Sequence, residues 1–156
     1  MLACDHQIDL PRKLFLAQLY QTSIVEEEGG AVLHFSNFRF YNIWIQGTII
    51  QICPTFLVLD DASSPSSLNP ELPPTAGLIR VDLDPEIIRI HPFLILGAEI
   101  AVIGRVWYDV EHDMFAVHNR NGDLRILDKS KDANAGSRWS LDVCRVHEEV
   151  YCPTVV

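Results

Sequence analysis

The sequence is poor in basic residues: 12 lysines and arginines stand against 21 aspartates and glutamates, giving a net charge of −9. A protein that binds nucleic acid by itself normally carries a basic surface that neutralises phosphates. Here the basic residues are scattered, and Arg12–Lys13 is the only adjacent pair. We therefore expect weak or no direct binding of nucleic acid by the isolated chain.

Other features that the sequence lacks exclude further classes of protein. No apolar run reaches the length that crosses a bilayer, and the apolar stretch Leu14–Tyr20 lacks a following cleavage site, so we expect no membrane contact and no signal peptide. The four cysteines form no Cys-x-x-Cys pair, which favours reduced thiols in the cytosol or nucleus. The six histidines are dispersed, so we expect no metal site and no cofactor.

Catalytic motifs are also missing. The chain has no Gly-rich phosphate loop, no Gly-x-Ser-x-Gly elbow and no His-Glu-x-x-His helix, so we expect a non-catalytic protein without catalytic residues. The pair Asp60–Asp61 could serve acid–base chemistry. Its place between an apolar run and a polar loop favours aspartates that cap backbone groups in a turn.

The first 37 residues are predicted to hold a helix and an acidic loop. Pro11 suits a first helical position, and apolar residues then recur at helical spacing, which predicts a helix over Leu10–Thr22. The acidic segment Glu26–Gly30 ends in a Gly-Gly pair and is predicted to be a loop.

Residues 38–128 are rich in β-branched and aromatic residues, which predicts strands. Gly47 lies inside the first strand and predicts a bulge or sharp bend. A polar insertion covers 62–76, and a short helical turn is predicted after Pro85. The predicted strands are Arg39–Ile52, Thr55–Leu59, Gly77–Leu83, Ala98–Trp107, and a fifth made of Met114–Val117 and Leu124–Leu127, which are one strand or two pieces of one.

Five such strands, with a helical connection between the third and fourth, predict an all-β protein with flanking helices. The architecture that fits is a five-stranded Greek-key barrel, the OB-fold, with N-terminal and C-terminal helices. An SH3-like barrel is the structural alternative, although its strands are usually shorter.

Residues 129–156 are predicted to be a linker and a C-terminal helix that binds a partner. Trp139 opens an apolar stripe at helical spacing, and further apolar residues fall off that stripe. A helix with two apolar sides is normally buried on both, although the stripe could pack against the chain's own barrel instead. The predicted partner-binding residues are Trp139, Leu141, Val143, Val146, Val150 and Tyr151.

OB barrels can also bind single strands by stacking bases on aromatic side chains over a basic groove. Several aromatic residues lie near the first two strands, where core packing is the competing interpretation. The candidate nucleic-acid contacts are Arg39, Trp44, Arg80, Arg105 and Arg125.

Three blocks of sequence carry a resemblance to a known family. Ile43–Ile50 is similar to a Trp-aliphatic-Gln-Gly start of the first barrel strand, and Leu96–Val106 to a Gly-x-x-hydrophobic-x-Val-x-Gly strand. Arg138–Val143 is similar to a C-terminal Trp-x-Leu-x-Val helix. Together they resemble the RecQ-mediated genome instability protein 2 family, the small OB-fold subunit of the complex of topoisomerase III and a Bloom-type helicase.

This resemblance implies a nuclear, non-catalytic scaffold. Its direct partner would be an OB-fold domain of a larger genome-stability subunit, with topoisomerase III and a RecQ-type helicase bound indirectly. The assembly would act in DNA repair and double Holliday junction dissolution. Asp60–Asp61 also resembles the Leu-Asp-Asp turn of the replication protein A middle subunit and of Stn-type telomere proteins. That family is the alternative, with single-stranded DNA binding or telomere capping as its implied function.

Overall fold

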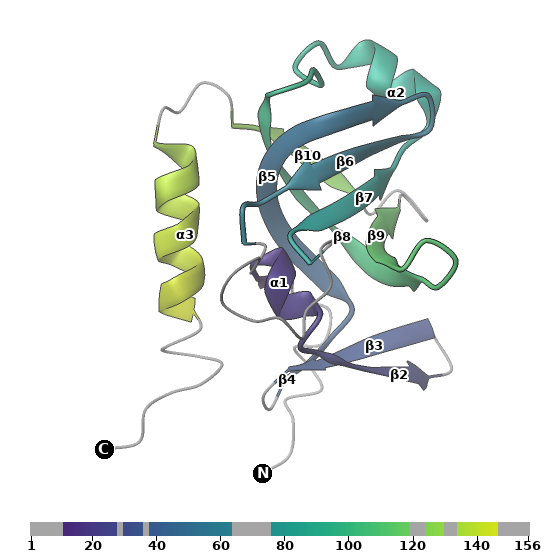
Figure 1. The fold of residues 1–156 in the computed structure, drawn as a ribbon, viewed down its shortest axis with the longest axis vertical. Helices are drawn as coiled ribbons and strands as arrows, with labels where there is room; N and C mark the ends of the chain where they lie inside the picture. The colour runs from purple at the N-terminus through teal and green to yellow at the C-terminus, as the bar shows by residue number, and fades with distance from the viewer. Residues whose placement is uncertain are drawn as a thin grey trace.

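The computed structural model describes residues 11–27, 30–35, 38–63, 76–118, 124–129 and 134–146. Most strands in this part of the chain belong to one seven-stranded sheet, and three others make a small separate sheet. Figure 1 shows the larger sheet curled into a barrel, with a helix beside it and the small sheet near one end.

Five strands form the barrel: β5 (Asn42–Cys53), β6 (Phe56–Asp60), β7 (Leu78–Asp82), β8 (Glu99–Asp109) and β9 (Met114–His118). Their order is β5-β6-β7-β9-β8, and a further pairing of β8 with β5 closes the barrel. Among these five strands, only the neighbours β7 and β9 run parallel. Helix α2 (Pro85–Ile90) connects β7 to β8. This order, with a helix between the third and fourth strands, defines an OB-fold and confirms the predicted fold class.

The long strand β5 serves two neighbours, because its first half pairs with β8 and its second half with β6. Gly47 lies where the strand changes partner. A Cβ atom there would stand 2.8 Å from the backbone oxygen of Asp60, so only glycine lets β6 come this close. The register also shifts between Ile49 and Gln51, which marks a bulge. The structure thus places the bulge two to four residues after Gly47, and at Gly47 itself it shows the close approach of β6.

The fifth barrel strand comes in two pieces, which is one of the two arrangements expected. β9 pairs with the second half of β8, and β10 (Arg125–Asp128) pairs with residues 100–103 of β8 on the same edge. Gly104 lies at the junction between them. A Cβ atom on Gly104 would come within 2.8 Å of the Leu124 side chain, so the glycine makes room for the chain as it enters β10.

The barrel is filled by apolar side chains that alternate along its strands, as in other small barrels. The same core includes side chains from outside the five strands, among them Leu14, Phe40 and Leu94. Its fully buried strand residues include Ile43, Ile45, Ile49, Leu57, Leu59, Ile79, Val81, Ile100, Val102 and Val117.

The predicted helix over Leu10–Thr22 is wrong for most of its described part. Strand β1 (Arg12–Lys13) pairs in parallel with β5, and helix α1 covers only Leu16–Leu19. This pairing makes β1 part of the larger sheet. Leu14 and Leu19 are fully buried in the barrel core. The apolar residues of this segment therefore fill part of the barrel core, and they do not form one face of a long amphipathic helix.

In the acidic segment Glu26–Gly30, predicted as a loop, the described residues Glu26, Glu27 and Gly30 instead belong to strands, and residues 28–29 lie outside the described part. Strands β2 (Ser23–Glu27), β3 (Gly30–Phe35) and β4 (Phe38–Phe40) make the antiparallel three-stranded sheet. Residues 23–26 are exposed, so β2 shows no buried face in its sequence, and its strand form depends on pairing with β3. The predicted strand Arg39–Ile52 is accordingly split between β4 and β5.

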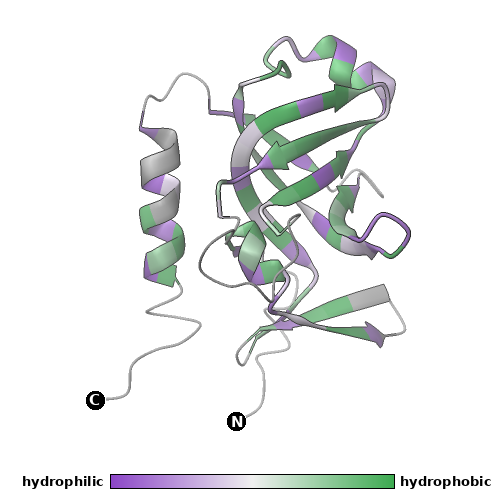
Figure 2. Cartoon of the chain, in the orientation of Figure 1, coloured by the Kyte–Doolittle hydropathy of each residue, from purple (hydrophilic) through white to green (hydrophobic). Residues whose placement is uncertain are grey.

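The C-terminal helix is confirmed as α3 (Ala135–Val146). It stands beside β1 and β5 and contacts both (Figure 1). Figure 2 shows mostly hydrophobic residues along the barrel strands, whereas α3 mixes hydrophobic and hydrophilic ones. Residues 64–75 of the predicted insertion and residues 147–156 lie outside the described part.

None of the described helices is long and apolar enough to cross a membrane. Across the same described ranges, no group of three or more His, Cys, Asp or Glu residues is placed to hold a metal ion.

Candidate functional site

Helix α3 packs one side against the barrel. Trp139 is 6% exposed and Val143 is fully buried, and Val146 packs against the edge of the core. The Trp139 ring lies on the Trp44 ring of β5, with centroids 6.4 Å apart and planes tilted by 36°. The apolar stripe of the helix therefore contacts this chain's own barrel, which is the alternative interpretation of that stripe.

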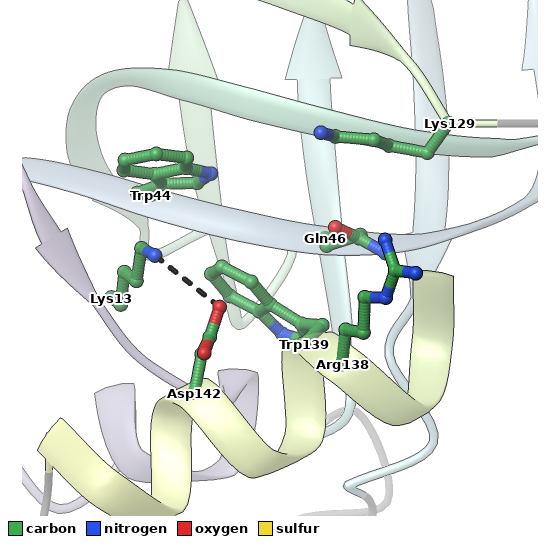
Figure 3. A pocket seen from close by; sticks show the side chains of 7 residues that line it. All are labelled: Lys13, Trp44, Gln46, Lys129, Arg138, Trp139 and Asp142. Atoms are coloured by element: carbon green, nitrogen blue, oxygen red, sulfur yellow. Dashed lines mark ion pairs between the residues drawn. The ribbon is translucent and has the colours of Figure 1, made fainter. Parts of the chain in front are cut away.

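Lys13 contacts both tryptophan rings and a carboxylate of α3. Its amine lies 4.3 Å from the centroid of the Trp44 ring and 5.9 Å from that of Trp139, in cation–π contact range. The same amine forms an ion pair with Asp142 at 3.6 Å (Figure 3). Because Lys13 comes from β1 and Asp142 from α3, this contact ties the helix to the strand that precedes the barrel.

The opposite side of α3 faces outward. Leu141 is 68% exposed, and Cys144 and Arg145 are exposed on the same side of the helix. Of the predicted partner-binding residues, Leu141 is thus the one with an open apolar surface. Val150 and Tyr151 lie outside the described residues.

A pocket of about 150 Å³ lies between α3 and the barrel. Figure 3 shows that its side chains come from β1, β5 and α3, together with Lys129 just after β10. Three of the lining residues also carry a buried nitrogen that has no hydrogen-bond partner among the described residues: Trp44 Nε1, Gln46 Nε2 and Trp139 Nε1. The complete lining is Lys13, Trp44, Gln46, Lys129, Arg138, Trp139 and Asp142.

The structure places the five candidate nucleic-acid contacts on strands of both sheets. Each belongs to a different strand, from β4 to β10. Trp44 is covered by Lys13 and Trp139, and the Arg105 guanidinium stacks 4.6 Å from the Tyr41 ring centroid. Arg125 is exposed on β10, whereas Arg39 is half-buried on β4.

Arg80 lies among carboxylates. Its guanidinium donates hydrogen bonds to Asp109 at 2.6 Å and to Asp82 at 2.7 Å, and it also lies 5.3 Å from the Trp107 ring centroid. Asp109 also contacts His112 Nδ1 at 2.7 Å. The hydrogen bond from Arg80 lowers the pKa of Asp109 to about 2. The two carboxylates offset the positive charge of the Arg80 guanidinium, which disfavours a phosphate at this residue.

The Asp60–Asp61 pair caps backbone groups, as its place before a polar loop predicted. Asp61 accepts hydrogen bonds from the backbone of Leu16 at 2.5 Å and from the backbone of Ser63 at 2.9 Å. Asp60 accepts one from Ala62 at 2.8 Å. Burial raises the pKa of Asp61, and the carboxylate fixes α1 to the end of β6.

The Lys13–Trp44 contact is the feature that the sequence did not predict. The sequence predicts Trp44 as a candidate nucleic-acid contact and offers Lys13 only as half of an isolated basic pair. The two meet because β1 pairs with β5 in register, with Lys13 opposite Trp44. The only sequence signal was the adjacent pair Arg12–Lys13 itself, the one concentration of positive charge near the N-terminus.

No protein-family model matches this chain, and no curated protein matches it in sequence. Solved structures do match. A chain of the S. pombe Stn1–Ten1 complex superposes with a TM-score of 0.58 at 15% identity, covering 90% of this chain and 93% of the other. A chain of a replication protein A heterotrimer bound to single-stranded DNA gives 0.56 at 12% identity, covering 89% and 96%. At these identities the likeness supports the OB-fold and extends over nearly the whole length of each chain.

Proposed function

We propose that this chain is a non-catalytic OB-fold subunit that binds an OB domain of a larger partner. In our proposal the pair belongs to a nuclear complex of a RecQ-type helicase and topoisomerase III, which acts in DNA repair and double Holliday junction dissolution. The observation that carries the proposal is the exposed Leu141 on a helix whose other side is already buried.

An exposed leucine matters here because of its position. Leu141 lies opposite the Trp139–Val143 side, so α3 is anchored to the barrel and still offers an apolar residue to a second surface. A helix docked in this way is pre-organised, so less conformational entropy is lost when a partner binds. An amphipathic helix laid into an apolar groove is a common mode of recognition.

Two further observations support a subunit that works in an assembly. The structural neighbours are a Stn1–Ten1 complex and a replication protein A heterotrimer, both assemblies of several subunits. The three sequence blocks that resemble the RecQ-mediated genome instability protein 2 family fall on β5, on β8 with the three residues before it, and on α3, and Leu141 belongs to the third of them. The setting in DNA repair depends on that resemblance.

The test compares partners recovered with three tagged chains in cells. The wild-type chain is expected to recover an OB-domain subunit, topoisomerase III and a RecQ-type helicase, quantified by mass spectrometry. Leu141→Asp is expected to lose them, because a buried unpaired carboxylate is costly at an interface. Val110→Asp is the matched control, since Val110 is 81% exposed in the turn after β8, away from α3.

Equal recovery of partners with Leu141→Asp and Val110→Asp would contradict the proposal that the Leu141 side of α3 binds the partner. Recovery of telomere proteins by the wild-type chain, with no topoisomerase, would instead support the alternative family. Far-UV circular dichroism of both variants establishes that each remains folded.

The second candidate function is a single-strand-binding subunit of the replication protein A or Stn type. It is favoured by the neighbour that was solved with single-stranded DNA and by the exposed Arg125 on β10. A fluorescence anisotropy titration of the purified chain with an oligo-dT separates the two functions. A scaffold gives weak or no binding at 50 mM salt, whereas tight binding that falls steeply with salt supports the second function.

A further inference from the structure

Strand β2 forms one edge of the small sheet, and in the part of the chain that the structure describes its only sheet neighbour is β3. The two strands pair through five consecutive residue pairs, from Ser23 opposite His34 to Glu27 opposite Gly30, without a register shift. In an antiparallel edge strand, alternate residues direct their backbone N–H and C=O groups away from the neighbouring strand. β2 therefore presents a regular row of hydrogen-bonding groups to which another extended chain can pair.

Most features that protect the edge of a sheet are missing from β2. Its sequence, Ser-Ile-Val-Glu-Glu, contains neither proline nor lysine, and its regular pairing with β3 contains no bulge. The opposite edge, β4, is more covered, because Phe40 is fully buried and the Arg12 guanidinium lies 4.6 Å from the Phe38 ring centroid. The open edge of the small sheet is therefore β2.

The side chains of β2 offer apolar contacts on both faces of this edge. Ile24 and Val25 are each 43% exposed, and successive side chains of a strand point to opposite faces. Their cross-strand partners on β3, Leu33 and Val32, are buried. Apolar surface thus extends from the interior of the small sheet to its edge, where an added strand would cover it.

The charge of this edge selects the strand that it can accept. Glu26 is exposed, it begins the run Glu26–Glu28, and the whole chain has a net charge of −9. Pairing of two copies of this chain through β2 would bring two acidic molecules together, which is unfavourable. A basic side chain opposite Glu26 would instead form a favourable cross-strand pair.

We propose that β2 accepts an extended segment of a protein partner as a fourth strand of the small sheet. The segment carries apolar residues opposite Ile24 and Val25 and a lysine or arginine opposite Glu26. In this mode of recognition the backbone hydrogen bonds supply the affinity, and the side chains of the added strand supply the specificity.

This surface goes beyond the proposed function. The proposed docking residue Leu141 belongs to α3, which contacts β1 and β5 of the larger sheet. β2 belongs to the separate small sheet near one end of the barrel (Figure 1). The two surfaces can therefore be tested independently.

The test titrates the full-length chain with synthetic peptides and follows its backbone amide signals by ¹H–¹⁵N NMR. The basic probe is acetyl-Thr-Lys-Lys-Val-Ile-Thr-amide, which in antiparallel register places a lysine opposite Glu26, valine opposite Val25 and isoleucine opposite Ile24. The acidic probe has glutamate in place of both lysines. We expect the basic probe to shift the signals of residues 23–27 saturably and to slow amide exchange there. Signals of β7, which is paired on both sides, are the internal reference and are expected to stay unchanged.

Two N-methylated forms of the basic probe test for strand pairing on the wild-type chain. Each form carries N-methyl groups on alternate residues, and an extended strand directs the N–H groups of alternate residues to the same edge. One form therefore blocks the edge that pairs with β2, whereas the other leaves it intact. We expect one form to lose binding and the other to bind as the parent peptide does.

Charge reversal tests the specificity. Glu26→Lys is expected to lower the ratio of the affinities for the basic and acidic probes by at least about fivefold, because the cross-strand charge pair is reversed. Glu111→Lys is the matched control, since Glu111 is exposed in the turn between β8 and β9 and the change in total charge is the same. Its affinity ratio is expected to stay near that of the wild type.

Several results would overturn the proposal. These are no saturable shift of residues 23–27, equal binding of the two N-methylated forms, and equal affinity ratios in Glu26→Lys and Glu111→Lys. A dimer of the free chain with slowed amide exchange at residues 23–27 would assign this edge to a second copy instead. Because each signal comes from the isolated chain, these results are independent of whether Leu141 docks a partner.

Discussion

Single residues decide where the strands of this barrel can approach one another. At Gly47 an added Cβ would meet the backbone oxygen of Asp60, and at Gly104 it would meet only the end of the Leu124 side chain, in both cases at 2.8 Å. The distances are equal, but the neighbours differ in how easily they move. A leucine side chain changes rotamer, whereas a backbone oxygen in a paired strand moves only with the strand.

We therefore expect Gly47→Ala to cost about 1–3 kcal/mol of the free energy of unfolding, as overpacking typically does. Gly104→Ala is expected to cost less than about 1 kcal/mol, because Leu124 can turn aside. Urea unfolding followed by tryptophan fluorescence measures both. Equal losses in the two variants would show that the close approach at Asp60 is not what requires Gly47.

A second residue-scale prediction concerns Asp109, whose pKa the hydrogen bond from Arg80 lowers to about 2. A carboxylate with a lowered pKa stabilises the fold fully above its unfolded-state pKa, which is about 3.9. This stabilisation is lost as the pH falls through the folded value. The difference in free energy of unfolding between the wild type and Asp109→Asn should therefore shrink between about pH 4 and pH 2.

The difference between the two proteins is the quantity to measure, by urea unfolding at a series of pH values. The wild-type curve alone also contains Asp61, whose pKa is raised by burial and whose contribution therefore has the opposite pH dependence. A difference that stays constant down to pH 2 would contradict the Arg80–Asp109 account.

At the scale of elements, the barrel strands could be predicted from sequence and the N-terminal elements could not. Runs rich in β-branched and aromatic residues, bounded by turn residues, located all five barrel strands, because such residues favour extended backbone. β1 has two residues and β2 has no described buried side chain, so neither leaves such a pattern. Their form depends on pairing with distant strands, which a single sequence does not reveal.

The candidate site could likewise be predicted from the sequence only in part. Helical spacing identified Trp139 and Leu141, because both belong to one continuous helix. The pocket was not predicted, because its lining comes from residues 13 to 142 and depends on the parallel pairing of β1 with β5.

Helix α3 is predicted to be a separable element. Trp139 and Val143 pack on β1 and β5 outside the barrel core, so Trp139→Ala should release α3 while the barrel stays folded. Limited trypsin digestion should then cleave after Arg138 and Arg145 at least about tenfold faster, which corresponds to about 1.4 kcal/mol of lost docking energy. Leu141→Ala, at an exposed position, is the control and should digest as the wild type does. Wild-type resistance in Trp139→Ala would mean that other contacts hold the helix.

At the scale of the whole molecule, the chain combines a closed barrel, an acidic surface and one docked helix with an exposed leucine. The barrel positions α3, the acidic charge disfavours nucleic acid, and the exposed side of α3 remains available to a partner. These features together favour a subunit that acts by binding another protein.

The most direct test of this account is hydrogen–deuterium exchange of the chain alone and in its purified partner complex. The account predicts that exchange in the complex slows most in peptides covering α3, residues 135–146, with little change in β6 and β7. Protection confined to β6 and β7, with α3 exchanging as it does in the free chain, would contradict it.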